Sequence, residues 1–155
     1  MGYRSNVWIG MLVESEDDAM KLLSRYGQAE RTRECQLLEY WSITRENGVY
    51  PNGKGCSVLF SFEGHDWKWY DSYEEVMGIR NIVDHAKALE IPYAYREVVF
   101  GEEIEDLRDY IDYSDDQNHL SDLIFDVFTV ARFCDTNGTH SEPVPAIDTY
   151  KLFVA

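Results

Sequence analysis

The sequence predicts an α+β fold, a largely antiparallel β-sheet with two helices on one face. Short segments rich in β-branched and aromatic residues have the composition of strands. Two longer segments between them carry apolar residues at helical spacing. The chain has 155 residues, 45% of them hydrophobic, which is enough for one domain with a sizeable core. We therefore expect a single domain over residues 1–155.

The first strand and helix are predicted at the start of the chain. "NVWIGMLVE" (6–14) is a short apolar run of the kind found in strands that are buried on both faces. Ser15 and Asp18 then form a capping box that predicts a helix start. Gly27 is the expected stop. One face of this helix is apolar and carries Ala19, Leu22, Leu23 and Tyr26.

Two strands joined by a turn are expected next. Residues 33–48 are ambiguous, but their later part favours a strand because it contains Tyr40, Trp41, Ile43 and Thr44. "NGVYPNGKG" (47–55) has the composition of a turn. "CSVLFSFEG" (56–64) alternates between apolar and polar residues, except at Leu59. Its apolar positions are Cys56, Val58, Phe60 and Phe62.

A second helix and further strands follow. Ser72 and Glu75 predict the helix start, and Pro92 ends the region. The apolar stripe between them contains Val76, Ile79, Val83 and Ala86. Strands are expected at 93–101 and 122–134, and a short edge strand at 150–155. The order is that of a ferredoxin-like βαββαβ fold with one or two extra C-terminal strands, whose helices would cover one face of the sheet.

The charge is the most unusual feature of the composition. The chain has 29 acidic and 14 basic residues, for a formal net charge of −15. Such a protein repels nucleic acid and anionic membranes, so we expect no direct binding to either and a partner with a basic surface. It has no long apolar stretch, and its three cysteines lack metal or redox spacing. These features predict a protein of the reducing cytoplasm.

The acidic residues are concentrated in the last third of the chain. Residues 101–155 hold thirteen acids and three bases, and ten of those acids fall between Glu102 and Asp126. Tyr110, Ile111 and Tyr113 are interleaved with them, which suits a protein interface better than a solubility tail. Spaced carboxylates can also imitate the phosphates of a nucleic acid. The predicted partner-binding residues are Glu102, Glu103, Glu105, Asp106, Asp109, Tyr110, Asp112, Tyr113, Asp115 and Asp116.

A second group of candidates is aromatic and comprises Trp67, Trp69, Tyr70 and Tyr73. These side chains could stack a base or nucleotide. They could equally form the packed junction between a strand and the second helix, which we favour for at least one tryptophan.

The motifs that suggest catalysis have better structural explanations. His65 and Asp66 are adjacent on a strand, so their side chains point to opposite faces. "NGKGCS" (52–57) lacks the spacing of a phosphate-binding loop, and Cys56 has no base nearby in sequence. The segment 109–120 lacks the glycine and glutamate that an EF-hand requires. We therefore expect no catalytic residues, no metal site and no cofactor.

Three segments resemble a known group of proteins. The "MGYRSNV" start, "DWKWYDSYEEV" before a helix, and "YREVVFGEE" followed by acids are together similar to a family of small acidic bacteriophage proteins. Residues 28–56 and the tail after Cys134 are longer here than in that family. The resemblance implies a phage origin, life in the bacterial cytoplasm and an accessory role against a host system. It brings no catalytic residues.

The expected function is therefore that of a non-enzymatic protein that binds and inhibits a host protein through an acidic surface. A nucleic-acid-handling defence enzyme, inhibited in the anti-CRISPR or anti-restriction manner, is one such target. One alternative is a small-ligand or nucleotide binder that uses the aromatic group with Arg80 or Arg96. Another is a metal-dependent hydrolase.

Overall fold

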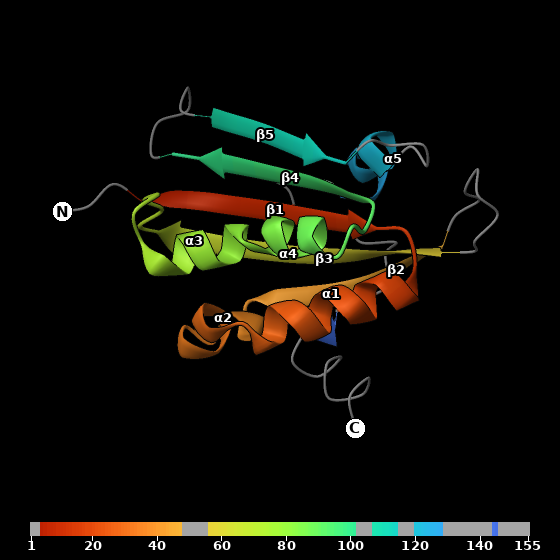
Figure 1. The fold of residues 1–155 in the computed structure, drawn as a ribbon. Helices are drawn as coiled ribbons and strands as arrows, with labels where there is room; N and C mark the ends of the chain where they lie inside the picture. Colours follow the sequence, from red (N-terminus) through yellow and green to blue (C-terminus); the bar gives the residue numbers. More distant parts are fainter. Residues whose placement is uncertain (1–3, 48–55, 102–106, 115–119, 129–143, 146–155) are drawn as a thin grey trace.

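A computed structural model describes residues 4–47, 56–101, 107–114, 120–128 and 144–145. Figure 1 shows a sheet with a layer of helices in front of it. The elements in chain order are β1 (Ser5–Val13), α1 (Glu16–Gln28), α2 (Glu30–Glu34), the 3-10 helix η1 (Leu37–Glu39), β2 (Trp41–Asn47), β3 (Cys56–Trp67), α3 (Glu74–Arg80), α4 (Ile82–Ala88), β4 (Tyr93–Phe100), β5 (Leu107–Tyr113), α5 (Leu120–Val127) and β6 (Val144–Pro145).

The sheet is antiparallel and has the strand order β5-β4-β1-β3-β2-β6. The predicted α+β class with a largely antiparallel sheet is confirmed. The strands predicted at 6–14, 56–64 and 93–101 correspond to β1, β3 and β4. The edge strand expected at 150–155 lies outside the described residues.

The sheet is covered on both faces, so the protein has two apolar clusters. In the larger one, alternate residues of β1 (Val7, Ile9, Met11 and Val13) pack with α1, α3 and α4. In the smaller one, Trp8 and Leu12 pack with α5. Leu59 of β3 belongs to this second cluster, which explains why it interrupts the alternation of β3. The apolar run of β1 thus reflects burial on both sides, as predicted.

The strand predicted at 122–134 is wrong for its first part, which is the helix α5. Leu120, Ile124 and Phe128 recur at helical spacing and are buried against the sheet. Phe125 of this helix is 50% exposed. Residues 129–134 lie outside the described part of the chain.

The helix termini follow the prediction at one site and not at others. Ser15 is the N-cap of α1 and its hydroxyl accepts a hydrogen bond from the Asp18 backbone N–H at 3.2 Å. The second helical region starts later than predicted: Tyr73 is the N-cap of α3 and makes no side-chain capping bond. The capping role of Ser72 is therefore wrong. Helix α1 also passes through Gly27 and ends at Gln28.

Ser15→Ala should lower the free energy of unfolding by about 1 kcal/mol, because it removes the cap of α1. Ser72→Ala is the matched control and should change it by less than about 0.5 kcal/mol, since Ser72 is exposed and outside the cap. Urea denaturation of both variants checks this. Equal losses in the two variants would contradict the assignment.

Gly10 of β1 makes room for the helix α5. A Cβ atom at this position would lie 2.6 Å from Cγ of the Phe128 ring and under 3.0 Å from two further ring carbons. The ring therefore rests directly on the backbone of the central strand. Any side chain at Gly10 would displace Phe128 and the end of α5 with it.

Gly10→Ala should lower the free energy of unfolding by about 1–3 kcal/mol, the usual cost of overpacking a core. Combined with Phe128→Ala, the same substitution should cost almost nothing, because the clashing ring is gone. A double-mutant cycle by urea denaturation measures the difference. An undiminished cost in the Phe128→Ala background would show that the ring is not the obstacle.

Candidate functional site

The predicted acidic region contains strand β5, which forms one edge of the sheet (Figure 1). Asp109, Tyr110, Asp112 and Tyr113 lie on this strand. The other six predicted partner-binding residues lie outside the described residues: Glu102, Glu103, Glu105, Asp106, Asp115 and Asp116. The predicted partner-binding residues can therefore be placed only on β5.

The two described acids point to opposite faces of the sheet, because side chains alternate along a strand. Asp109 lies on the α5 face, where Arg96 donates to both carboxylate oxygens at 3.2 and 3.0 Å. Asp112 lies on the other face, 3.7 Å from the Lys87 ammonium group of α4. Both acids therefore have a basic partner within the chain, and neither belongs to a continuous patch with the other.

Arg96 also ties the helix α5 to the sheet. Its guanidinium carbon lies 4.7 Å from the centroid of the Phe125 ring. It also donates a hydrogen bond to the Phe128 carbonyl at 3.5 Å. Asp109 thus contributes to the fold as well as to the surface charge, because its carboxylate orients the arginine that contacts α5.

Strand β5 exposes three large apolar side chains. Leu107, Tyr110 and Tyr113 are 53%, 55% and 53% exposed. Exposed aromatic residues on an edge strand are uncommon, because such edges are normally protected from pairing. Together with the neighbouring acids, they give β5 the mixture of apolar anchors and charge that occurs in protein interfaces.

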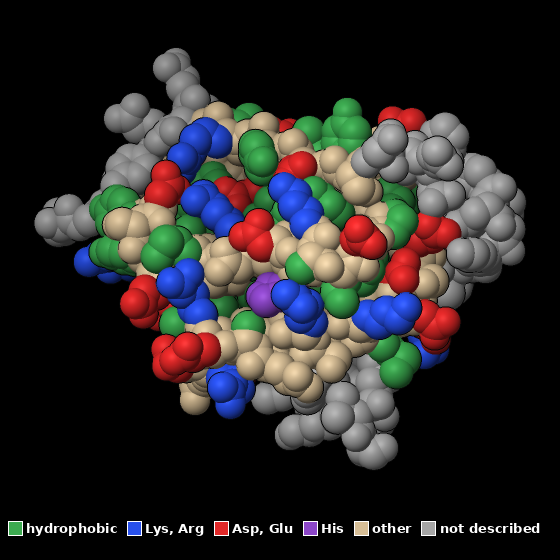
Figure 2. Space-filling model, in the orientation of Figure 1, with side chains coloured by type: hydrophobic (Ala, Val, Ile, Leu, Met, Phe, Trp, Pro, Cys, Tyr) green, Lys and Arg blue, Asp and Glu red, His purple; other side chains and the backbone are tan. Residues whose placement is uncertain are grey.

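A cleft of about 500 Å³ lies beside β5, between the helical layer and strands β4 and β5. Its lining is mostly charged and includes Arg80, Asp84, Lys87, Glu97, Tyr110 and Asp112. Figure 2 views this helix-covered face and shows acidic and basic side chains interspersed on it. The strong acidity of the whole chain is therefore not displayed as a uniform patch on this described face.

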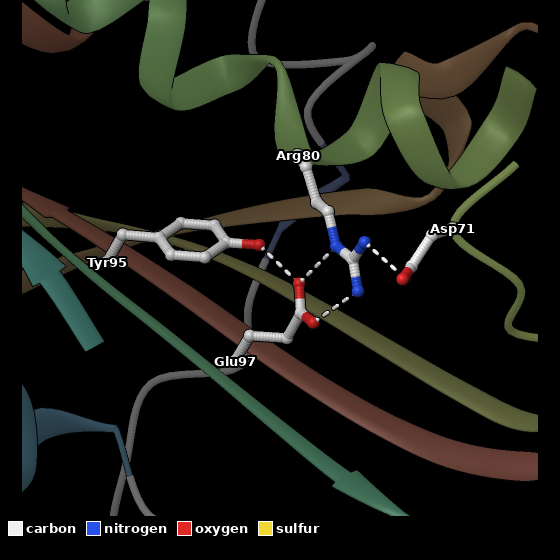
Figure 3. Close-up of polar contacts among 4 residues, drawn as sticks. All are labelled: Asp71, Arg80, Tyr95 and Glu97. Carbon is white, nitrogen blue, oxygen red and sulfur yellow. Dashed lines mark hydrogen bonds and ion pairs between the residues drawn. The ribbon is translucent and has the colours of Figure 1, made fainter. Parts of the chain in front are cut away.

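The cleft is organised by one ion-pair network, drawn in Figure 3. Arg80 donates from Nε and Nη2 to the two Glu97 oxygens at 3.0 and 2.8 Å. It donates from Nη1 to Asp71 at 2.7 Å. The Tyr95 hydroxyl donates to Glu97 Oε1 at 2.7 Å. The guanidinium is thus shared by two carboxylates.

The environment shifts the pKa values of these side chains so that Arg80 and Asp71 stay charged. Burial by itself lowers the pKa of Arg80, but the hydrogen bonds to Glu97 and Asp71 outweigh it and raise the pKa overall. The hydrogen bond from Arg80 lowers the pKa of Asp71. Burial, followed by the charge of Glu97, raises the pKa of Tyr95 well above its ordinary value. Tyr95 therefore stays protonated and acts as a donor.

Arg80→Met should lower the free energy of unfolding by about 3 kcal/mol, because it leaves the Glu97 carboxylate buried without its cation. The Arg80→Met and Glu97→Met double variant should recover much of this loss. Urea denaturation of both variants checks this; an equal loss in the single and double variants would indicate lost packing alone.

This network was not predicted from the sequence, although one signal was present. Tyr93, Tyr95, Glu97 and Val99 alternate along β4 on one face, so Glu97 is the single acid among the β4 residues that face the core. A buried carboxylate requires a partner. The sequence did not indicate which of the chain's bases would be that partner.

The aromatic candidates form a packed junction. Trp69 is 4% exposed and stacks on Phe62 at 5.8 Å between ring centroids, while Trp67 contacts both rings. Tyr70 packs edge-on against Tyr73, which is 44% exposed. The prediction that at least one tryptophan belongs to the junction is confirmed. Of the four aromatic candidates, mainly Tyr73 is accessible to a ligand.

Of the remaining sequence candidates, His65 and Asp66 lie within the described residues, whereas residues 52–55 and 115–119 do not. His65 contacts Glu63 at 2.9 Å rather than Asp66, as the alternation of a strand requires. No group of three His, Cys, Asp or Glu side chains in the described part of the chain is arranged to hold a metal ion. No helix within the described residues is long and apolar enough to cross a membrane.

Comparisons with known proteins identify no relative. No family model matches the chain, and no curated protein or solved structure is significantly similar to it. The geometry of β5 and its neighbouring cleft is therefore the basis for a functional assignment.

Proposed function

We propose that this protein is a non-enzymatic binding protein that recognises a partner with a basic surface through β5 and the acids next to it in sequence. The observation that carries the proposal is the exposure of Leu107, Tyr110 and Tyr113 on an edge strand that also bears acids. Apolar anchors supply most of the binding energy of an interface, and the surrounding charge speeds association and selects the partner.

The resemblance to small acidic phage proteins suggests the class of partner and where it would be found. The partner would be a bacterial protein in the cytoplasm, such as a nucleic-acid-handling defence enzyme, and binding would inhibit it. The net charge of −15 favours a basic groove that otherwise holds nucleic acid. Masking that groove requires affinity but no catalytic group.

The framework that presents β5 is, we infer, a ferredoxin-like unit with added edge strands. The order β4-β1-β3-β2 within the sheet supports this, as does the sequence of strands and helices from β1 to β4. In that arrangement, β5 extends the sheet on the β4 side.

The nucleotide-binding alternative has less support. Trp67 and Trp69 pack against Phe62, and Arg80 is paired with Glu97 and Asp71. Arg96, the other arginine considered for this role, contacts Asp109 and Phe125 on the α5 face. A ligand that stacks on these aromatic rings would have to displace packing contacts.

The proposal predicts that neutralising acids next to β5 abolishes partner binding. The variant Glu102→Gln, Glu103→Gln, Glu105→Gln changes the charge by three units while leaving Asp109 and its contact with Arg96 in place. In affinity capture from bacterial lysate with mass spectrometry, the parent should retain a basic protein that this variant loses. Binding of the purified partner should also weaken steeply with salt, because exposed charges are screened.

A matched control distinguishes the effect of the position of the acids from the effect of the total charge. Glu30→Gln, Glu34→Gln, Glu39→Gln removes the same charge from exposed positions on α2 and η1. It should retain the partner as well as the parent does. If both triple variants retain the partner equally, the acids next to β5 are only solvated and the proposal fails.

A further inference from the structure

The outer edge of β5 has a defined pattern of backbone groups. The Ser114 N–H donates to the Tyr93 carbonyl at 3.1 Å, so the backbone N–H and C=O groups of residue 114 are directed toward β4. Such residues alternate along an antiparallel strand, so Arg108, Tyr110 and Asp112 also direct their N–H and C=O groups toward β4. Leu107, Asp109, Ile111 and Tyr113 direct theirs outward.

None of the described residues pairs with this outer edge, since β5 ends the strand order of the sheet. Figure 1 shows β5 along the margin of the sheet, with β4 on its inner side. An edge of this kind can accept another strand, whose backbone supplies the missing hydrogen bonds. Short length and charged side chains commonly prevent such pairing. Here, however, three of the seven residues of β5 are large, apolar and more than half exposed.

We propose that the outer edge of β5 binds an extended, basic segment of the partner protein as an additional strand. This rests on the proposed function and specifies its partner class and binding mode. Acids are present on both faces of the edge, Asp109 on one and Asp112 on the other. Alternate side chains of an added strand would lie next to each of them, so lysine or arginine is favoured on either face.

The exposed tyrosines strengthen this choice of partner. Tyr110 and Tyr113 also lie on opposite faces of the sheet, and their rings offer surfaces for the aliphatic stems and charges of basic side chains. A second copy of this chain is a poorer occupant, because each copy carries a net charge of −15. Pairing of two such edges would bring like charges together.

Hydrogen exchange measured by NMR provides a direct test. The probe is a synthetic peptide of about eight residues, a typical strand length, in which pairs of lysines alternate with pairs of valines so that each face of the strand carries lysine. The same peptide with glutamate in place of lysine is the charge control. With the lysine peptide, the outward N–H groups of Asp109, Ile111 and Tyr113 should exchange at least about tenfold more slowly. The inward N–H groups of Tyr110 and Asp112 should be protected already in the free protein.

A pair of variants isolates the backbone contribution. Asp109→Ala and Asp109→Pro both remove the carboxylate, but only proline removes the outward N–H. Proline is tolerated at such a position of an edge strand because that N–H is not used within the sheet. Asp109→Pro should bind the lysine peptide about tenfold more weakly than Asp109→Ala. Circular dichroism checks the fold of each; if the proline variant does not fold, the exchange data on the parent decide.

The outcomes distinguish the inference from the proposed function. Binding of the lysine peptide without protection of the outward N–H groups would overturn strand addition and leave an acidic interface standing. Equal protection by both peptides would overturn the choice of a basic partner, and protection by neither would overturn strand addition altogether. Protection that appears without peptide and rises with protein concentration, together with dimers in sedimentation, would identify a second copy as the occupant. Failure of the proposed function itself is decided separately, by the captured partner and the triple glutamine variants.

Discussion

Burial of the central strand β1 on both faces is the constraint on which the rest of the structure depends. Val7, Ile9 and Met11 are fully buried under the helical layer, and Leu12 is fully buried on the α5 side. Two flanking strands satisfy its backbone, and two separate layers must cover its side chains. The helical layer alone would leave Trp8 and Leu12 in water. Helix α5 is thus a requirement of the sheet, and Gly10 is the position that lets α5 approach through Phe128.

Ion pairs and hydrogen bonds also connect the sheet to the helices that cover its two faces. Arg80 links the helical layer to β4 through Glu97, and Arg96 links β4 to β5 and α5 through Asp109 and the Phe128 carbonyl. Both arginines bind carboxylates in a bidentate manner, a geometry that fixes orientation as well as charge. These two contacts hold β4 and β5 in register with the helices on each face.

This arrangement changes how the acidity of the chain should be understood. The high negative charge is not simply spread over one face, because the described acids of β5 are on opposite sides and each has a basic neighbour. What distinguishes β5 is the combination of an unpaired outer edge among the described residues, exposed apolar side chains and charge on both sides. Electrostatics would then act mainly on association and partner choice, whereas backbone pairing and the tyrosines would supply affinity.

The sequence by itself determined the class of fold, the strands β1, β3 and β4 and the first helix cap, because these depend on local periodicity and on side chains three residues apart, but it did not predict β5 as a strand. It also indicated the acidic, aromatic character of β5, since that is a property of composition. It did not reveal helix α5: the segment satisfies both a strand and a helix pattern, and only the uncovered face of β1 and β3 decides between them. Nor could it pair Arg80 with Glu97, seventeen residues apart, or Arg96 with Asp109. Those relations depend on which strand lies beside which, and strand order is set by long-range packing that no local pattern contains.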